Sequence, residues 1–181
     1  MRLLIAGAEG QVALALSEAA RDAADMVAVA AGRPELDLLL PETVRRLVAD
    51  FAPDVVINAA AYTAVDRAEQ ESDLASLINC DGARHLAEAA KDCGAAIIHI
   101  STDYVFDGGK ASPYVEDDQT GPLNVYGLSK LAGEIAIMSA NPRHVIVRTS
   151  WVHSAAGSNF VTTMLRQASE RSELRIVDDQ I

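Results

Sequence analysis

The fold is decided by the stretch from residue 2 to residue 13, which reads Arg2-Leu-Leu-Ile-Ala6-Gly7-Ala8-Glu9-Gly10-Gln11-Val12-Ala13. Its first residues form a short apolar run, as expected of a buried strand, and a helical pattern begins at Gln11. The two glycines between strand and helix permit a tight turn in which helix N-terminal N–H groups approach an anion. The spacing differs from Gly-x-Gly-x-x-Gly, so a plain strand-to-helix turn is the alternative to a pyrophosphate site.

Outward from this turn, short runs rich in Val and Ile alternate with longer segments of helical period. The predicted strands cover residues 2–6, 26–30, 55–58, 95–101, 144–149 and 174–177. The predicted helices cover residues 11–22, 42–51, 74–93, 128–140 and 158–169. This alternation is typical of β-α-β units around a doubly wound parallel sheet, and the continuous apolar strands suggest burial on both faces.

The chain has 181 residues, a length typical of one domain, and a formal net charge of −11. An acidic surface argues against a nucleic-acid or anionic-membrane partner, because both require a basic face. The sequence also lacks a long uncharged apolar stretch and a signal-peptide pattern, which favours a cytoplasmic protein. Residues 107–122 form the longest irregular stretch, either a mobile substrate loop or a solvated connection.

The end of the second predicted strand bears on the choice of cofactor. An acidic ribose ligand is expected there for NAD, whereas Gly32-Arg33 follows this strand. Arg33 can pair with the 2′-phosphate of NADP, so NADPH is favoured over NADH, and an ordinary surface charge is the alternative. Asp37 and Leu38 could hold the adenine amino group and ring, although an acidic residue before a helix would look the same.

Tyr126 and Lys130 are spaced i and i+4, so they project from one face of a predicted helix. A phenol is a poor acid–base group near neutral pH until a nearby cation lowers its pKa. Thr102 follows the fourth strand, at the edge where open α/β sheets bind ligands, and its hydroxyl can hydrogen-bond a substrate carbonyl. Without Thr102, a surface tyrosine stacked on a lysine would be the better interpretation.

Two further strand ends converge on the same crevice. Small residues in Asn58-Ala59-Ala60-Ala61-Tyr62-Thr63 would let a cofactor ribose and nicotinamide lie on the backbone. The fifth strand ends in Arg148-Thr149-Ser150-Trp151, where Trp151 is either a pocket wall or a structural aromatic. Together these segments predict a ketone reductase site that faces a dinucleotide.

The motifs resemble the extended short-chain dehydrogenase/reductase superfamily and, within it, the dTDP-4-dehydrorhamnose reductase family. The matching segments are Gly-x-x-Gly-Gln-Val from Gly7, Asn-Ala-Ala-Ala-Tyr-Thr-Ala-Val-Asp-Arg-Ala-Glu from Asn58, Ser-Thr-Asp-Tyr-Val-Phe-Asp-Gly from Ser101, Pro-Leu-Asn-Val-Tyr-Gly-x-x-Lys-x-x-Gly-Glu from Pro122, and Arg-Thr-Ser-Trp-Val from Arg148. The resemblance implies a Rossmann-like NAD(P)-binding domain over residues 1–181 and hydride transfer from NADPH, or NADH, to the C4 ketone of dTDP-4-dehydro-L-rhamnose.

The resemblance also assigns individual residues. Tyr126 would be the proton donor, Lys130 would lower its pKa and hold the nicotinamide ribose, and Thr102 would orient the carbonyl. The remaining cofactor contacts would come from Gly7, Gly10, Gln11, Val12, Arg33, Asp37, Leu38, Ala59, Ala61, Tyr62 and Thr63. The sugar pocket would be lined by Val65, Thr102, Asp103, Tyr104 and Trp151.

Two departures from the family pattern qualify the resemblance. Ala15 stands where some family members have a glutamate that bridges a dimer through magnesium, so we predict no metal site, and any homodimer would form without one. Family members also continue past Ile181 into a region that completes the nucleotide-sugar pocket, so this chain is expected to turn over poorly by itself. The alternatives are another nucleotide-sugar reductase or epimerase, and a non-catalytic regulatory module, against which Thr102, Tyr126 and Lys130 argue.

Overall fold

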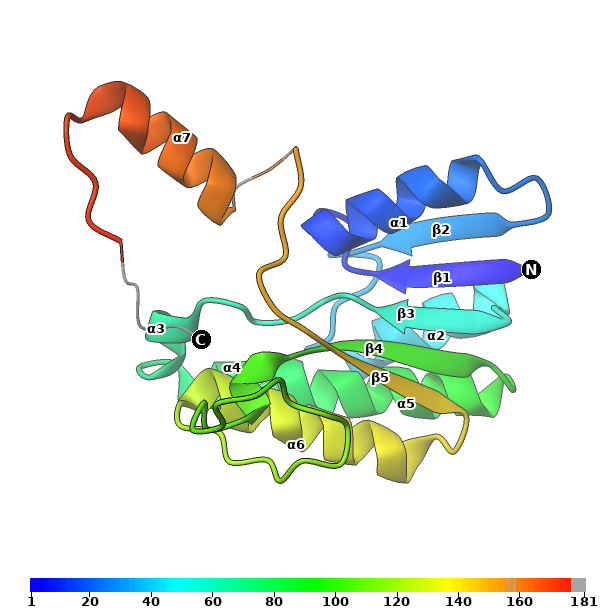
Figure 1. Cartoon of the computed structure of the whole chain (residues 1–181). Helices are drawn as coiled ribbons and strands as arrows, with labels where there is room; N and C mark the ends of the chain where they lie inside the picture. Colours follow the sequence, from blue (N-terminus) through cyan, green and yellow to red (C-terminus); the bar gives the residue numbers. More distant parts are fainter. Residues whose placement is uncertain (156, 158, 177–181) are drawn as a thin grey trace.

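The computed structural model describes residues 1–155, 157 and 159–176, and it contains a five-stranded sheet in the order β2-β1-β3-β4-β5 (Figure 1). All four pairings are parallel. The strand bounds are β1 Arg2–Ala6, β2 Val27–Ala31, β3 Val55–Asn58, β4 Ala96–Thr102 and β5 His144–Thr149. The predicted α/β class with a doubly wound parallel sheet is therefore confirmed.

The strand order reverses direction at β1, which has β2 on one side and β3 on the other. At such a switch point the connections leave toward opposite faces of the sheet, and a crevice opens outside the carboxyl ends of the strands. The register brings Ala6 opposite Asn58 and Thr102 opposite Thr149. The candidate residues that follow these strands therefore share one edge of the molecule.

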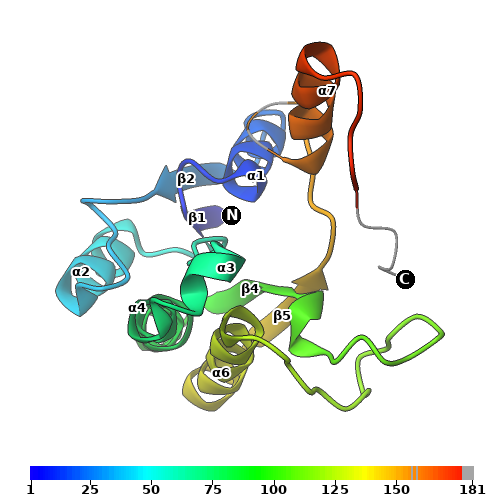
Figure 2. The same ribbon diagram turned by 90° about the vertical axis from the view of Figure 1, so that its left-hand side faces the viewer.

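Helices lie on both faces of the sheet, as Figure 2 shows. Helix α1 covers one face, where Ala13 and Leu16 pack against Leu3, Ile5 and Ile57. The larger core lies on the other face, under α2, α5 and α6. The helix bounds are α1 Gln11–Arg21, α2 Pro41–Phe51, α3 Val65–Ala68, α4 Ser72–Ser76, α5 Ala83–Asp92, α6 Val125–Ala140 and α7 Phe160–Glu170.

Two helical segments differ from the predicted ranges. The helix expected over 74–93 begins earlier, as α4, and passes through a π-helical segment, η1 (Leu77–Gly82), before α5. The helix expected from residue 128 begins at Val125, because the Asn124 side chain accepts a hydrogen bond from the Gly127 N–H and caps it. Tyr126 thus lies inside the first turn of α6. The short helix α3 and the 3-10 turn η2 (Asp103–Val105) were not predicted.

The prediction of a strand over 174–177 is wrong for residues 174–176, which are irregular, and Val177 lies outside the described residues. A parallel strand joins a sheet through a crossover helix that packs on that sheet. Helix α7 would be this crossover, yet none of its described residues is buried, and it stands apart from the sheet in Figures 1 and 2. Residues 171–176, which follow α7, therefore do not form a strand beside β5.

The outer strands are also less buried than predicted. Exposure alternates along β2 and β5. Val145 of β5 is 54% exposed, and its register with Ile98 places it on the same face as α1. Burial on both faces holds for the central strands, where Leu4, Ile5 and Val56 are fully buried. Within the part of the chain that the structure describes, no helix is both long and apolar enough to cross a membrane.

Candidate functional site

The turn after β1 passes very close to the loop after β3. Gly7 has φ +108°, and a Cβ placed there would lie 3.0 Å from the backbone nitrogen of Ala60. Only glycine combines this conformation with such an approach. Helix α1 then begins at Gln11 with Gly10 as its N-cap, which supplies no side-chain cap. The positive end of the α1 dipole is thus presented at the sheet edge, where it favours an anion.

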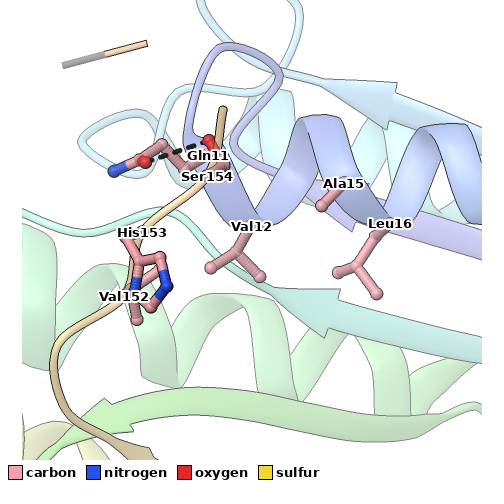
Figure 3. A pocket seen from close by; sticks show the side chains of 7 residues that line it. All are labelled: Gln11, Val12, Ala15, Leu16, Val152, His153 and Ser154. Carbon is pink, nitrogen blue, oxygen red and sulfur yellow. Dashed lines mark hydrogen bonds between the residues drawn. The ribbon is translucent and has the colours of Figure 1, made fainter. Parts of the chain in front are cut away.

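The side chain of Gln11 joins this turn to the segment after β5. Its Oε1 accepts hydrogen bonds from Ser154 Oγ at 3.2 Å and from Asn159 Nδ2 at 3.0 Å. A cavity of about 280 Å³ lies beside this link (Figure 3), lined by Gln11, Val12, Ala15, Leu16, Val152, His153 and Ser154. None of these residues belongs to the Tyr126 and Lys130 group. We therefore define the candidate site by the convergence of strand ends and not by this cavity.

The structure places the predicted adenine-side residues around the end of β2. Arg33 is exposed, and the preceding Gly32 lies against Ala8 of the phosphate turn. Asp37 accepts a hydrogen bond from the Leu39 N–H at 2.9 Å. Leu38 is only 7% exposed and belongs to the core, so its main contacts are with the protein. Arg33 is thus available to a ligand, and the predicted adenine contact of Leu38 stays a prediction.

The loop that contains Ala59, Ala61, Tyr62 and Thr63 is held by a residue that the sequence analysis missed. Asn79 accepts a hydrogen bond from the Tyr62 N–H at 2.8 Å, and its Nδ2 donates to the Tyr62 carbonyl at 3.0 Å. Asn79 lies in the π-helical segment η1, where the widened turn aims it at the loop. Its Nδ2 also donates to Ser129 of α6, which ties the loop to the helix that carries Lys130.

Tyr126 lies on α6 beside the carboxyl end of β4, next to Thr102. Burial raises its pKa above the ordinary 10.0, and a side-chain hydrogen bond with Thr102 opposes this rise. The Thr102 hydroxyl also donates to Asp103 Oδ1 at 3.1 Å. The Tyr104 ring contacts the Tyr126 ring edge-on, with centroids 5.5 Å apart. The two predicted catalytic hydroxyls therefore meet at one point on the sheet edge.

Lys130 is 1% exposed and lies one helical turn beyond Tyr126. Its Nζ donates to the Ile100 carbonyl at 2.7 Å and lies 3.1 Å from Nε2 of His99. Burial lowers the pKa of Lys130 from 10.5 to about 8, while the carboxylate of Glu134 opposes this change. A lysine in this state can exchange its proton near neutral pH.

The predicted sugar-pocket residues lie at the end of β4, in η2, after β5 and at the start of α3. Asp103 Oδ2 accepts a hydrogen bond from Ser150 Oγ at 2.7 Å, which joins the ends of β4 and β5. Trp151 has φ +53° and is 57% exposed, and its ring meets Phe160 edge-on. Val65 is the first residue of α3. The structure brings Thr102, Asp103 and Tyr104 together, whereas Trp151 and Val65 have no direct contact with Tyr126 among the interactions described.

A partly buried ion pair behind the site was not predicted either. Glu134 of α6 is 1% exposed and accepts two hydrogen bonds from the Arg148 guanidinium, at 3.1 and 2.8 Å. The same carboxylate accepts a hydrogen bond from Ser101 Oγ. These contacts attach α6 to the last residues of β4 and β5, which fixes Tyr126 against the strand ends. In the described ranges, no three His, Cys, Asp or Glu side chains are grouped to hold a metal ion.

The switch-point crevice, the glycine turn on the N-terminus of α1, and the Tyr126, Lys130 and Thr102 group together define a Rossmann-like protein of the short-chain dehydrogenase/reductase type. A family model described as the RmlD substrate binding domain matches residues 1–181. The chain belongs to this family.

Proteins similar in sequence and in structure are consistent with this family. A dTDP-4-dehydrorhamnose reductase from Sinorhizobium fredii (strain NBRC 101917 / NGR234) is 53% identical over 181 residues, which is 100% of this chain and 60% of the relative. The crystal structure of a dTDP-4-dehydrorhamnose reductase from Clostridium acetobutylicum has a TM-score of 0.95 at 40% identity, covering 99% of this chain and 63% of that one.

A dTDP-4-dehydrorhamnose reductase from Bacillus anthracis, crystallised in complex with NADP, has a TM-score of 0.91 at 40% identity and covers 96% of this chain and 61% of that one. The chain spans about 60% of the length of the curated relatives it matches. The comparisons therefore identify the family of the chain, and they match only part of each relative.

Proposed function

We propose that the chain binds NADPH, with NADH as the alternative, and supports reduction of the C4 ketone of dTDP-4-dehydro-L-rhamnose to dTDP-L-rhamnose. The observation that carries the proposal is the meeting of Tyr126 with Thr102 at the sheet edge, one turn from the buried Lys130. The names of the relatives and the NADP complex of the Bacillus anthracis protein support it.

The residues present fit a dinucleotide. Gly7 lets the turn pass close to the backbone of the β3 loop, where a Cβ would lie 3.0 Å from the Ala60 nitrogen. The N-terminus of α1 offers backbone donors and a favourable dipole for a pyrophosphate, and Gln11 and Val12 lie beside it. Arg33 is exposed past the end of β2, where it can reach a 2′-phosphate. NADPH would supply the hydride when bound.

In the proposed reaction, Tyr126 donates a proton to the carbonyl oxygen of the substrate. The Thr102 hydroxyl orients this oxygen and hydrogen-bonds it as negative charge develops. The ammonium form of Lys130 stabilises the phenolate that remains on Tyr126, because an opposite charge nearby favours ionisation. Asp103 and Tyr104 line the sugar side of the site, and we assign Val65 and Trp151 to more distant parts of the same pocket.

The first experiment asks whether the 181-residue chain binds NADPH, by titration of cofactor fluorescence. Turnover is then measured with dTDP-4-dehydrorhamnose, on the chain and on a chimera that adds the unmatched C-terminal part of the Sinorhizobium fredii relative. Tyr126→Phe should keep the cofactor affinity and lose nearly all turnover, about a hundredfold or more, because it removes the proton donor. Reduction by this variant at the parental rate would overturn the assignment.

The same measurements separate the alternatives. A regulatory module would bind NADPH and show no turnover in the chimera, whereas an enzyme for another nucleotide sugar would reduce a different substrate in a panel of nucleotide 4-ketosugars. Cytoplasmic location and a homodimer without a metal bridge also stay predictions. Sedimentation of the chain with and without EDTA tests the dimer, which should be unaffected by the chelator.

A further inference from the structure

A chain of buried polar contacts runs from the β3 loop to Lys130. The Ala60 N–H donates to Asn58 Oδ1 at 3.2 Å, and Asn58 Nδ2 lies 3.1 Å from Nδ1 of His99. Nε2 of the same ring lies 3.1 Å from Nζ of Lys130. Asn58, His99 and Lys130 are each 1% exposed, so these side chains are shielded from bulk water.

The direction of each hydrogen bond follows from the first one. A backbone N–H can only donate, so it selects the oxygen of the Asn58 amide and turns the NH₂ group toward His99. Nδ1 of His99 must then accept, and a neutral imidazole that accepts at Nδ1 carries its proton on Nε2. Burial lowers the pKa of His99 from 6.5 to about 2, and Lys130 adds to this effect, so the ring is neutral.

In the contact between His99 and Lys130, the ring therefore donates through Nε2–H, and the nitrogen of Lys130 has to accept. The only acceptor that a lysine can offer is the lone pair of its neutral amine. We propose that Asn58 and His99 are positioning residues for Lys130: Asn58 fixes the tautomer of His99, and the proton on Nε2 disfavours the positive charge on Lys130. The Ile100 carbonyl accepts one N–H of the amine and completes the arrangement.

The other charged groups around Lys130 do not cancel the effect of His99 on its charge. Glu134 lies one turn further along α6 and favours the ammonium, but its carboxylate is shared with Arg148 of β5 and Ser101 of β4. From β4 the group that faces Nζ is His99, while Asp103 of η2 acts on Tyr126. The network thus sets how strongly Lys130 holds its proton.

The consequence for the reaction rests on the proposed function. If the ammonium of Lys130 stabilises the Tyr126 phenolate, then turnover falls as pH rises through the Lys130 titration. The Ala60–Asn58–His99 chain would set this upper pH limit. Ala60 lies in the loop that we assign to the cofactor, so the hydrogen bond that fixes the tautomer begins at the binding site itself.

The tautomer can be observed without a mutation. The chain has four histidines, and ¹⁵N-detected spectra at pH 9 report which ring nitrogen of each carries the proton. His99→Gln assigns the His99 signals by their loss. We expect a protonated Nε2 and an unprotonated Nδ1 for His99. The opposite tautomer would overturn the proposal, because Nε2 would then accept from Lys130.

The charge on Lys130 is tested with Asn58→Asp, which has the same shape. A carboxylate accepts from both the Ala60 N–H and Nδ1–H, so Nε2 becomes an acceptor and the ammonium is favoured. The chain contains three lysines, Lys91, Lys110 and Lys130, so ¹³Cε-lysine spectra resolve the titration directly. We expect the midpoint of Lys130 to rise by about one pH unit. An unchanged or lower midpoint would refute the proposal.

Asn141→Asp is the matched control. Asn141 is equally buried and lies at the far end of α6, eleven residues beyond Lys130, where its Nδ2 donates to backbone carbonyls. The Asn141→Asp substitution introduces the same charge without contact to His99. The titration midpoint of Lys130 should therefore stay at the parental value. A rise as large as that of Asn58→Asp would mean that buried charge alone, and not the tautomer, controls Lys130.

Kinetics separate this inference from the proposed function. In an active protein, the upper pH limit of kcat should move up together with the Lys130 midpoint in Asn58→Asp. A shifted midpoint in a protein that reduces no nucleotide ketosugar would leave the network correct and the proposed reaction wrong. A shifted midpoint with an unmoved pH limit would show that Lys130 does not control turnover.

Discussion

At the scale of single residues, the site is positioned by two glycines of α6. A Cβ on Gly127 would collide with the Tyr104 carbonyl, and a Cβ on Gly133 would collide with the Asn79 carbonyl. Both contacts would be far closer than real Cβ atoms approach a backbone oxygen. The absence of side chains at these positions lets α6 lie directly against the segments that orient Tyr126 and the β3 loop.

Gly133→Ala should therefore destabilise the protein by about 1–3 kcal/mol, because α6 must move away from η1. The free energy of unfolding in urea measures this effect. Gly121→Ala is the control, since the nearest atom to its added Cβ would be 3.6 Å away. Equal stability of the two variants would show that α6 and η1 separate without cost.

Arg33→Ala tests the choice of cofactor. Removing a guanidinium from the 2′-phosphate should weaken NADPH binding by roughly tenfold and leave NADH binding unchanged. Fluorescence titration with each cofactor gives the two affinities, and the NADPH difference should shrink at high salt because the site is exposed. Equal losses for both cofactors would assign Arg33 to the structure of the β2 loop.

At the scale of elements, the two well-capped helices have different roles. Asn124 caps α6, which is packed in the core, and Asn159 caps α7, none of whose described residues is buried. Asn124→Ala should lower the global stability by about 1 kcal/mol and reduce turnover, because the cap holds the turn that contains Tyr126. Asn159→Ala should lower the helix content and remove the hydrogen bond to Gln11. It should change the urea midpoint less than Asn124→Ala does, because α7 is not packed in the core.

Elements with a local signal were predicted well from the sequence. The continuous apolar runs of β1 and β3 are buried on both faces, and β4 continues this pattern with one face fully and the other partly buried. The π-helical segment was not predictable, because its apolar spacing continues that of the flanking helices. The predicted strand is wrong over residues 174–176 because a strand depends on the packing of the helix before it, and no described residue of α7 is buried.

The same distinction holds for the candidate site. Tyr126, Lys130 and Thr102 were found because their spacing and strand positions carry chemical meaning within short segments. Asn58, Asn79 and His99 were not singled out, although each is fully buried and hydrogen-bonded around the site. Their partners are distant in sequence, His99 being 41 residues from Asn58 and 31 from Lys130, and no local pattern reports such a pair.

At the scale of the whole molecule, buried ionisable groups make the stability depend on pH. The pKa of His99 is about 2 in the folded protein against an ordinary 6.5, so below pH 6.5 the unfolded chain binds the additional proton. Stability should fall as pH decreases through this range, by up to about 1.4 kcal/mol per unit from this group. Urea unfolding at pH 7.0 and 5.0 measures the loss.

His99→Gln provides the comparison, because it removes the titrating ring and keeps a polar side chain. The variant should lose less stability than the parent between these pH values. Lys130 affects stability at alkaline pH, because its pKa is about 8 in the folded protein against an ordinary 10.5. Between these two pKa values the unfolded chain binds more protons than the folded protein, so the free energy of unfolding should rise with pH. Identical pH profiles for parent and His99→Gln would show that His99 is not held neutral.

The π-helical segment also constrains the length of the chain. Each residue of a helix advances the direction of the next side chain by roughly 100°. Substitutions within Leu77–Gly82 keep the directions of the neighbouring side chains. Deletion of a single residue there would instead rotate α4 relative to α5 about the helix axis and turn Asn79 away from Tyr62. Apart from Asn79 and Gly82, whose contacts are specific, sequences of this family that share the site should therefore tolerate replacement in this segment far better than any change in its length.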